Sequence, residues 1–235
     1  MRIGSDYPKI RWETNDWVFL EPNALIGDVL LFSVSIYFGY LIYQRKESRF
    51  YLWWSRFFFC FGIAFLCGGF GHFLFEYTGI IGKYPSWYLG MVATFCIERA
   101  MVELQAENLR ATWKKIATVK LVLGILLESY LLIGLGTDDD VTKGLIVPTW
   151  FTIIGLGFAL GYLGYTYQKN IDNSFKWLFW SVLILLPSAL FQGLKINLHP
   201  WFDRNDVSHV LLIVSLIMYY RGIKNWNGKT LALNT

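Results

Sequence analysis

Long apolar runs separated by short polar segments recur along the whole chain, and they constrain its fold more than any other feature. A helix needs about 20 predominantly apolar residues to cross the hydrocarbon core of a bilayer. Charged residues make up 16% of the 235 residues and hydrophobic residues 55%, whereas soluble domains carry about 25% charged residues. The sequence therefore predicts an integral membrane protein built from helices.

Seven of these runs are long enough for a transmembrane helix. We expect spans over residues 24–43, 57–76, 86–102, 116–135, 148–167, 175–194 and 206–220. Pro187 is expected to kink the sixth span, because proline removes a helical hydrogen bond. No repeat, low-complexity segment or soluble domain interrupts the pattern, so residues 1–235 are expected to form a single all-α domain, a seven-transmembrane-helix bundle.

The basic residues that flank the expected spans are more numerous on the side that holds the C-terminus. Because Lys and Arg accumulate in cytoplasmic loops, we expect the N-terminus outside and residues 1–23 as an extracytoplasmic segment. Residues 225–235 are then a cytoplasmic tail, in a plasma membrane or a bacterial inner membrane. The net charge of +4 reflects these flanking residues, so membrane lipid is the expected partner and nucleic acid is not.

In this orientation, four ionisable side chains lie at similar depth near the outer surface: Asp28, His72, Asp206 and His209. Asp206 and His209 are three residues apart and share a helix face. A charged group at the bilayer centre costs about 2.5–3.5 kcal/mol on insertion scales, so several such groups are expected to pair or to bind a cation. Two imidazoles and one or two carboxylates could hold zinc in an open, catalytic arrangement, with Asp28 as a fourth ligand or as the base that activates water.

Two further acids lie inside expected spans. Glu98, about three turns into the third span, would lie deeper and could orient a zinc ligand from behind. Pairing with Arg99, Arg110 or a group on another helix explains Glu98 equally well. For Glu128, in the fourth span, the sequence indicates no partner.

Three oxygen-bearing side chains cluster just before the first span: Asp16, Glu21 and Asn23. Calcium prefers oxygen ligands of this kind, so this segment could hold a calcium ion. Helix capping by Asn23 and ordinary solvation are alternative explanations for the same residues.

These features together resemble the alkaline ceramidase family, which belongs to the CREST superfamily of seven-span membrane hydrolases with the adiponectin-receptor-like proteins. The resemblance covers the overall layout and three short motifs. The first is Asp16 and Trp17 followed by Glu21 and Asn23 before the first span. The others are a histidine late in the second span and a histidine that opens the seventh.

The resemblance implies that zinc-bound water hydrolyses a lipid amide or ester, with calcium at the N-terminal segment. In that family one histidine of the second span and two of an HxxxH motif in the seventh hold zinc. His72 and His209 match the first and last of these positions, while Asn205 stands where the family has the other histidine. Gly68 stands where the family has a serine.

Two other classes of protein are consistent with the same residues. The first is a non-catalytic membrane protein, a receptor, transport or assembly subunit, whose polar cluster is a structural network or a proton relay. The second is a protein that holds a b-type haem between His72 and His209. A microbial-type rhodopsin is disfavoured, because the seventh expected span contains no lysine for a Schiff base.

Overall fold

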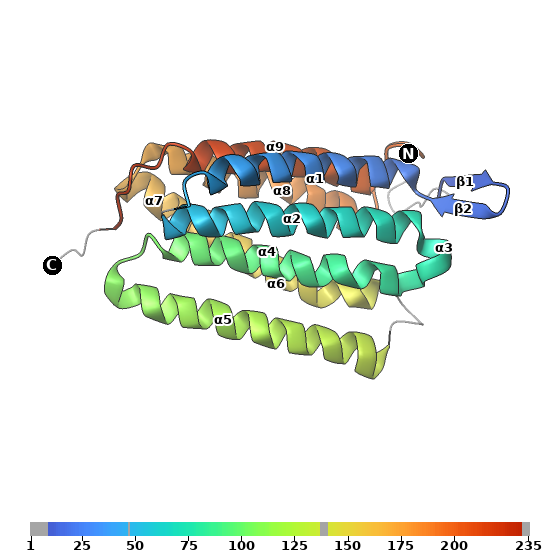
Figure 1. Ribbon diagram of the computed structural model, residues 1–235, viewed down its shortest axis with the longest axis horizontal. Coiled ribbons are helices and arrows are strands. Elements are labelled where there is room, and N and C mark those ends of the chain that lie inside the picture. The colour runs from blue at the N-terminus through green and yellow to red at the C-terminus, as the bar shows by residue number, and fades with distance from the viewer. Residues whose placement is uncertain (1–8, 47, 137–140, 232–235) are drawn as a thin grey trace.

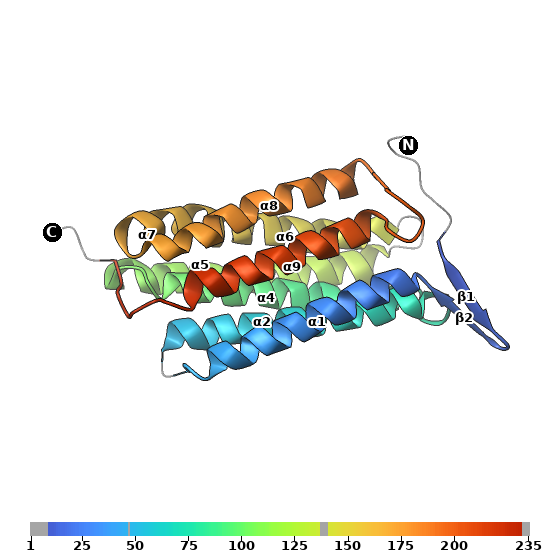
Figure 2. The same ribbon diagram turned by 90° about the horizontal axis from the view of Figure 1, so that it is seen from above.

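The computed structural model describes residues 9–46, 48–136 and 141–231. Long helices run side by side along one axis and form an elongated bundle (Figures 1 and 2). They are α1 (Pro22–Tyr43), α2 (Arg49–Phe73), α4 (Tyr84–Val102), α5 (Glu107–Ser129), α6 (Ile146–Leu156), α8 (Lys176–Gly193) and α9 (Arg204–Ile223).

Shorter helical segments connect or extend these helices. A short helix α3 (Phe75–Thr78) and the 3₁₀ turn η1 (Gly79–Lys83) join α2 to α4. The other short segments are η2 (Tyr130–Leu135) after α5, η3 (Val141–Leu145) before α6, η4 (Gly157–Leu163) and α7 (Gly164–Asn170) after α6, and η5 (Asn173–Phe175) before α8.

Six helical segments of the described chain are long and apolar enough to cross a membrane. They are Pro22–Tyr43, Arg49–Phe73, Glu107–Leu135, Lys143–Asn170, Asn173–Gly193 and Arg204–Ile223. The all-α fold and the membrane character expected from the sequence are therefore confirmed. The N-terminal segment and the C-terminal tail are described only from residue 9 and up to residue 231, so the rest of these two predictions lies outside the described residues.

Helix α4 is the remaining long helix, and it occupies the range in which the sequence predicts the third span. It lies beside α2, α5 and α6 (Figure 1). Ile97, Ala100 and Met101 are fully enclosed by these neighbours. Because α4 faces protein on several sides, it carries the polar residues Glu98 and Arg99 and is less apolar than a lipid-facing helix.

Two helices begin earlier than the sequence predicts. Helix α2 begins at Arg49 instead of residue 57, and α5 begins at Glu107 instead of residue 116. Hydropathy detects only the part of a helix that matches the hydrocarbon core, whereas backbone hydrogen bonding continues until a residue breaks it. The expected spans therefore lack the start of α2, where Arg49 and Arg56 flank an aromatic stretch, and the polar first turns of α5.

The segment before α1 forms a β-hairpin that the sequence analysis does not predict. Strands β1 (Arg11–Thr14) and β2 (Trp17–Leu20) pair antiparallel, with Arg11 opposite Leu20 and Thr14 opposite Trp17. Asn15, in the two-residue turn, has a left-handed backbone with φ 37°, which asparagine tolerates better than most residues. The hairpin protrudes at the end of the bundle where α1 begins and α2 ends (Figure 2).

Glycine lets α1 and α2 approach closely at the depth of Asp28. A Cβ atom built on Gly69 of α2 would lie 2.8 Å from the Cβ of Asp28 on α1. About two helical turns further into the bundle, a Cβ built on Gly62 of α2 would lie 3.1 Å from the Cβ of Ser35 on α1. Small residues allow the backbones of neighbouring helices to approach closely in membrane bundles. The two glycines of α2 therefore fix how α2 packs against Asp28.

We expect Gly69→Ala to lower the melting temperature of the purified protein by several degrees. The new methyl group overlaps Asp28, and overpacking of this kind costs about 1–3 kcal/mol. Gly68→Ala is the matched control, because a Cβ there meets the Cβ of Ser86 at an ordinary 3.5 Å. The control should be neutral or slightly stabilising, since alanine favours helix; equal melting temperatures for both variants would contradict the close approach.

Candidate functional site

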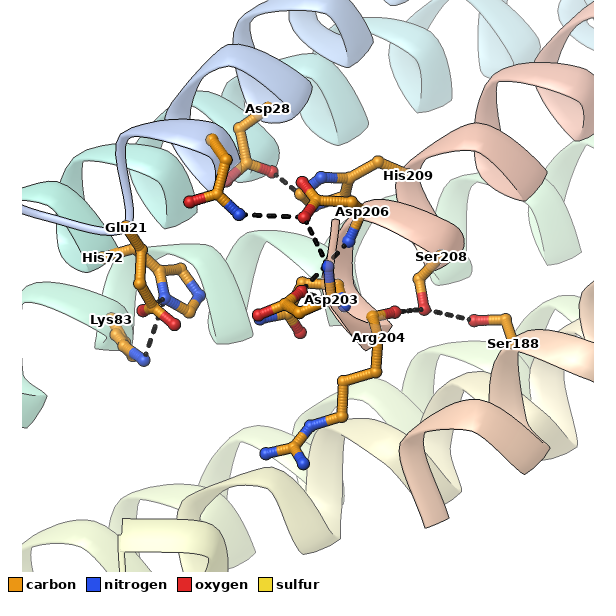
Figure 3. A network of polar contacts seen from close by, with 12 residues as sticks. Glu21, Asp28, His72, Lys83, Ser188, Asp203, Arg204, Asp206, Ser208 and His209 are labelled. Atoms are coloured by element: carbon orange, nitrogen blue, oxygen red, sulfur yellow. Dashed lines mark hydrogen bonds and ion pairs between the residues drawn. The ribbon is translucent and has the colours of Figure 1, made fainter. Parts of the chain in front are cut away.

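Polar side chains gather at the end of the bundle that carries the hairpin, and they form two separate groups (Figure 3). One group, the Glu21–His72 cluster, consists of Lys9, Glu21, His72 and Lys83. The other is the Asp28–His209 pair, with Asp206 beside it. Both histidines lie at this end of the bundle, but each histidine has its own acid.

The Glu21–His72 cluster links the start of α1 to the end of α2. Nδ1 of His72 lies 2.7 Å from Oε2 of Glu21, and Nζ of Lys9 donates to the same oxygen at 2.9 Å. Nζ of Lys83 lies 3.4 Å from Nδ1 of His72. Because Nδ1 directs its proton toward Glu21, Lys83 acts there as a neighbouring positive charge. Glu21 also has a left-handed backbone with φ 49°, a conformation that costs about 1–3 kcal/mol and that these contacts offset.

The charges of this cluster shift two pKa values. Burial alone would raise the pKa of Glu21, but the hydrogen bond from His72 and the charges of His72 and Lys9 outweigh it and lower that pKa to about 2. Burial lowers the pKa of Lys83 to about 8, and the charge of Lys9 acts in the same direction. Glu21 is therefore a carboxylate throughout the physiological range.

The Asp28–His209 pair joins α1 to α9. Nε2 of His209 lies 3.2 Å from Oδ1 of Asp28, and both side chains are buried. Nδ1 of His209 is also buried and has no hydrogen-bond partner in the described chain. The imidazole fits only because Gly27 lacks a side chain, since a Cβ there would lie 2.2 Å from Nδ1.

Asp206 begins α9 and serves as part of a capping box. Its Oδ2 accepts hydrogen bonds from the backbone N–H of Asp203 at 2.9 Å and from Nδ2 of Asn23 at 2.8 Å. Asp203 is the N-cap residue, and its Oδ1 accepts from the backbone N–H of Asn205 at 2.7 Å. These bonds satisfy the free N–H groups of the first helical turn, so Asp206 fixes the start of α9 and ties it to α1.

A groove lies between α1 and α9, with these polar groups at one end. Its volume is about 310 Å³, at the lower end of the 300–1,000 Å³ typical of ligand pockets. This α1–α9 groove is lined by Asn23, Ile26, Gly27, Leu30, Trp201, Phe202, Asp206, His209, Val210 and Ile213. Its apolar walls are exposed on the outer surface of the bundle, so in a membrane they face lipid.

The expected zinc ligands do not converge. His72 is bound to Glu21 and does not line the groove that His209 lines, while Asp206 is occupied by its capping bonds. In the described part of the chain, no group of three or more His, Cys, Asp or Glu side chains could hold a metal ion. Zinc binding remains a prediction, and the described side chains do not provide a suitable set of ligands for it. Because His72 and His209 lie in separate groups, a haem held between them has no support either.

The three expected calcium ligands also lie apart. Asp16 is in the hairpin turn, Glu21 binds Lys9 and His72, and Asn23 donates its amide to Asp206. Asn23 does not cap α1 either, because Glu21 is the residue at the N-cap. Calcium binding thus remains a prediction, because Asp16, Glu21 and Asn23 do not direct their oxygens to one site.

Glu98, expected behind a zinc ligand, pairs instead with a lysine of another helix. Its Oε1 lies 2.7 Å from Nζ of Lys120 on α5, so Glu98 pairs with a group on another helix. The pair lies against Gly155 of α6, on the side of the bundle away from α1 and α9 (Figure 1). Glu98 therefore belongs to a different polar region, and its expected role at the histidines stays without support.

The site contains polar residues that the sequence pattern did not indicate. Lys9 and Lys83 complete the Glu21–His72 cluster, and Asp203 caps α9. For Asp203 a signal was available, because Asp followed three residues later by an acid just before an apolar run is a helix-start pattern. For the two lysines no local pattern exists, since their contacts depend on the fold. His199, in the loop before α9, accepts a hydrogen bond from the backbone N–H of Trp201.

The fold and the buried polar side chains define a helical integral membrane protein. A family model described as a family of unknown function (DUF6962) matches residues 24–227. The match covers most of the chain, from α1 to just beyond α9, and the chain belongs to this family. Comparison with the curated proteins and with the solved structures found no match.

We expect Glu21→Gln to lower the free energy of unfolding at pH 7 by about 2 kcal/mol, the worth of a hydrogen bond to a charged group. Because the pKa of Glu21 is lowered from 4.5 to about 2 in the folded state, this stability is present above pH 4.5 and is lost as the pH falls toward 2. Melting curves at several pH values measure it. Glu13→Gln, at an exposed hairpin position, should show no such effect, and a pH-independent difference for Glu21→Gln would contradict the pairing.

Proposed function

We propose that the protein binds a membrane lipid in the α1–α9 groove, with the polar linkage of the lipid at the Asp28–His209 pair and one acyl chain along α1 and α9. The observation that carries this proposal is the polarity gradient of the groove. Asn23, Asp206 and His209 form its end near the helix termini, and apolar side chains such as Leu30 and Ile213 form the rest.

The chemistry of the groove favours an amphiphile over a soluble ligand. An acyl chain can reach the exposed apolar walls from the bilayer without crossing water. Trp201, beside the polar end, is of a residue type that settles at the membrane–water interface. The polar side chains at this end of the groove, Asn23, Asp206 and His209, suit the N–H or O–H of an amide-linked or hydroxylated lipid.

In this proposal the chain crosses the membrane seven times, with α4 as the third crossing. The hairpin and residues 224–231 lie at opposite ends of the bundle (Figure 1), as an odd number of crossings requires. The distribution of Lys and Arg supports an outer hairpin and a cytoplasmic C-terminal end, in a plasma membrane or bacterial inner membrane. The groove then opens to the outer leaflet.

A second candidate is the lipid hydrolase implied by the resemblance to alkaline ceramidases. A specific observation favours it: a buried carboxylate, Asp28, orients an imidazole, His209, at the polar end of a lipid-facing groove. A histidine held by an acid is a common general base. The metal that the family uses would need ligands that the described side chains do not bring together.

Filling the groove should prevent lipid binding. We expect Leu30→Trp to reduce photocrosslinking of a photoactivatable N-acyl lipid in reconstituted vesicles at least tenfold, because the larger side chain occupies the acyl path. Val29→Trp is the control, since Val29 is exposed on the same helix but does not line the groove. Equal labelling of both variants and wild type would contradict the proposal.

A turnover assay separates binding from hydrolysis. If the second candidate holds, purified protein releases fatty acid from an N-acyl lipid, and His209→Gln lowers the rate at least a hundredfold, as expected when a general base is lost. His199→Gln, in a loop outside the groove, keeps the wild-type rate. Absence of turnover together with a zinc content far below one per chain leaves lipid binding as the function.

A further inference from the structure

A second set of polar contacts lies between α4, α5 and α6, on helices that do not line the α1–α9 groove. Nζ of Lys114 contacts Oε1 of Glu103 at 2.7 Å. Five residues back along α4, the Glu98–Lys120 pair follows. One further turn along, the hydroxyls of Thr94 and Thr152 are 3.3 Å apart.

The series continues to the hairpin end of the bundle. The hydroxyl of Tyr88 on α4 lies 2.9 Å from that of Ser129 on α5, and Glu128 is the neighbour of Ser129. From Glu103 to Tyr88 the rise of an α-helix gives about 22 Å, most of the roughly 30 Å thickness of a hydrocarbon core. We call this series, from Glu103–Lys114 to Glu128, the α4–α5 polar row.

Glu128 is the unusual member of the row. Its side chain is fully buried, with an exposed fraction of 0%, and neither carboxyl oxygen has a hydrogen-bond partner in the described residues. The titratable side chains on the elements packed at this end of α5 are Tyr84 and Tyr88 on α4, Tyr130 on η2 and Lys143 on η3. None of them bonds to the carboxyl group.

Burying a charged carboxylate without a partner costs much more free energy than burying the neutral, protonated acid. Unpaired buried polar groups are also uncommon in folded proteins and call for an explanation. One oxygen of Glu98 is likewise buried without a partner. Ionisable groups inside membrane helices are rare and mark functional sites such as ion pathways and proton relays. One isolated carboxyl group offers too few oxygens to hold a metal cation.

An apolar plug separates the two parts of the row. A Cβ on Gly124, between Lys120 and Glu128 on α5, would lie 2.8 Å from the ring of Phe151 and 3.5 Å from the sulfur of Met91. Met91, Phe151 and Val147 form a small core of their own. Because Gly124 has no side chain, the ring of Phe151 and the sulfur of Met91 lie against α5 between Lys120 and Glu128.

We propose that the α4–α5 polar row is a proton pathway, in which Glu128 binds a proton at the outer side and exchanges it with the Glu98–Lys120 pair across the plug. A proton that reaches Glu98 continues to Glu103–Lys114 at the cytoplasmic end. The step transfers H⁺ alone, driven by the membrane potential or a pH gradient, and needs no redox partner. The pathway is independent of lipid binding, because none of its residues lines the groove.

Proton flux in vesicles tests the proposal. Purified protein is reconstituted with the pH-sensitive dye pyranine inside, and a potassium gradient with valinomycin sets an inside-negative potential. We expect wild type to acidify the interior at several times the rate of protein-free vesicles. Glu128→Gln should lower the rate to that of protein-free vesicles, because the amide has nearly the same shape but does not exchange a proton.

Glu107→Gln is the matched control, since Glu107 is exposed at the start of the same helix; this variant should conduct as wild type does. Infrared spectroscopy adds a readout that does not depend on flux, because Glu128→Gln should remove a protonated carboxyl band from the wild-type spectrum. The proposal is overturned if wild type is no faster than protein-free vesicles, if Glu128→Gln conducts like wild type, or if the carboxyl band is unchanged.

Discussion

A charge inside a hydrocarbon environment needs a partner, and the Asp28–His209 pair shows how this chain meets that requirement. The pair connects α1, near the start of the chain, to α9, near its end. Two glycines make the contact geometrically feasible, because Gly27 leaves room for the imidazole and Gly69 lets α2 lie against Asp28. The contact lies beside the polar end of the groove, where α1, α2 and α9 pack together.

The sequence predicted the helical segments and the level of the polar groups well. Apolar runs locate transmembrane helices because their length is fixed by the bilayer. Once the direction of each helix is known, residue number gives depth at about 1.5 Å per residue. This reasoning predicts Asp28, His72 and His209 at one end of the bundle. In the structure they lie near the start of α1, the end of α2 and the start of α9, which share one end of the bundle (Figure 2).

The sequence could not predict which of these polar side chains contact one another. Whether His72 meets Glu21 or His209 depends on helix rotation and on which helices are neighbours, and sequence periodicity leaves both open. Glu98 illustrates the same limit, since its partner Lys120 lies on another helix. The hairpin before α1 did leave a signal, because Asn15 and Asp16 form a turn-prone pair between residues typical of strands. Hydropathy alone does not detect a short hairpin of this kind.

Asp28 and His209 act as one unit that holds α1 to α9. A double-mutant cycle with Asp28→Asn and His209→Gln, measured as free energies of unfolding in detergent, tests it most directly. Residues in direct contact show interaction energies of about 0.5–3 kcal/mol, so we expect the double variant to be clearly less destabilised than the sum of the single variants. Additive effects, with an interaction energy near zero, would contradict the account.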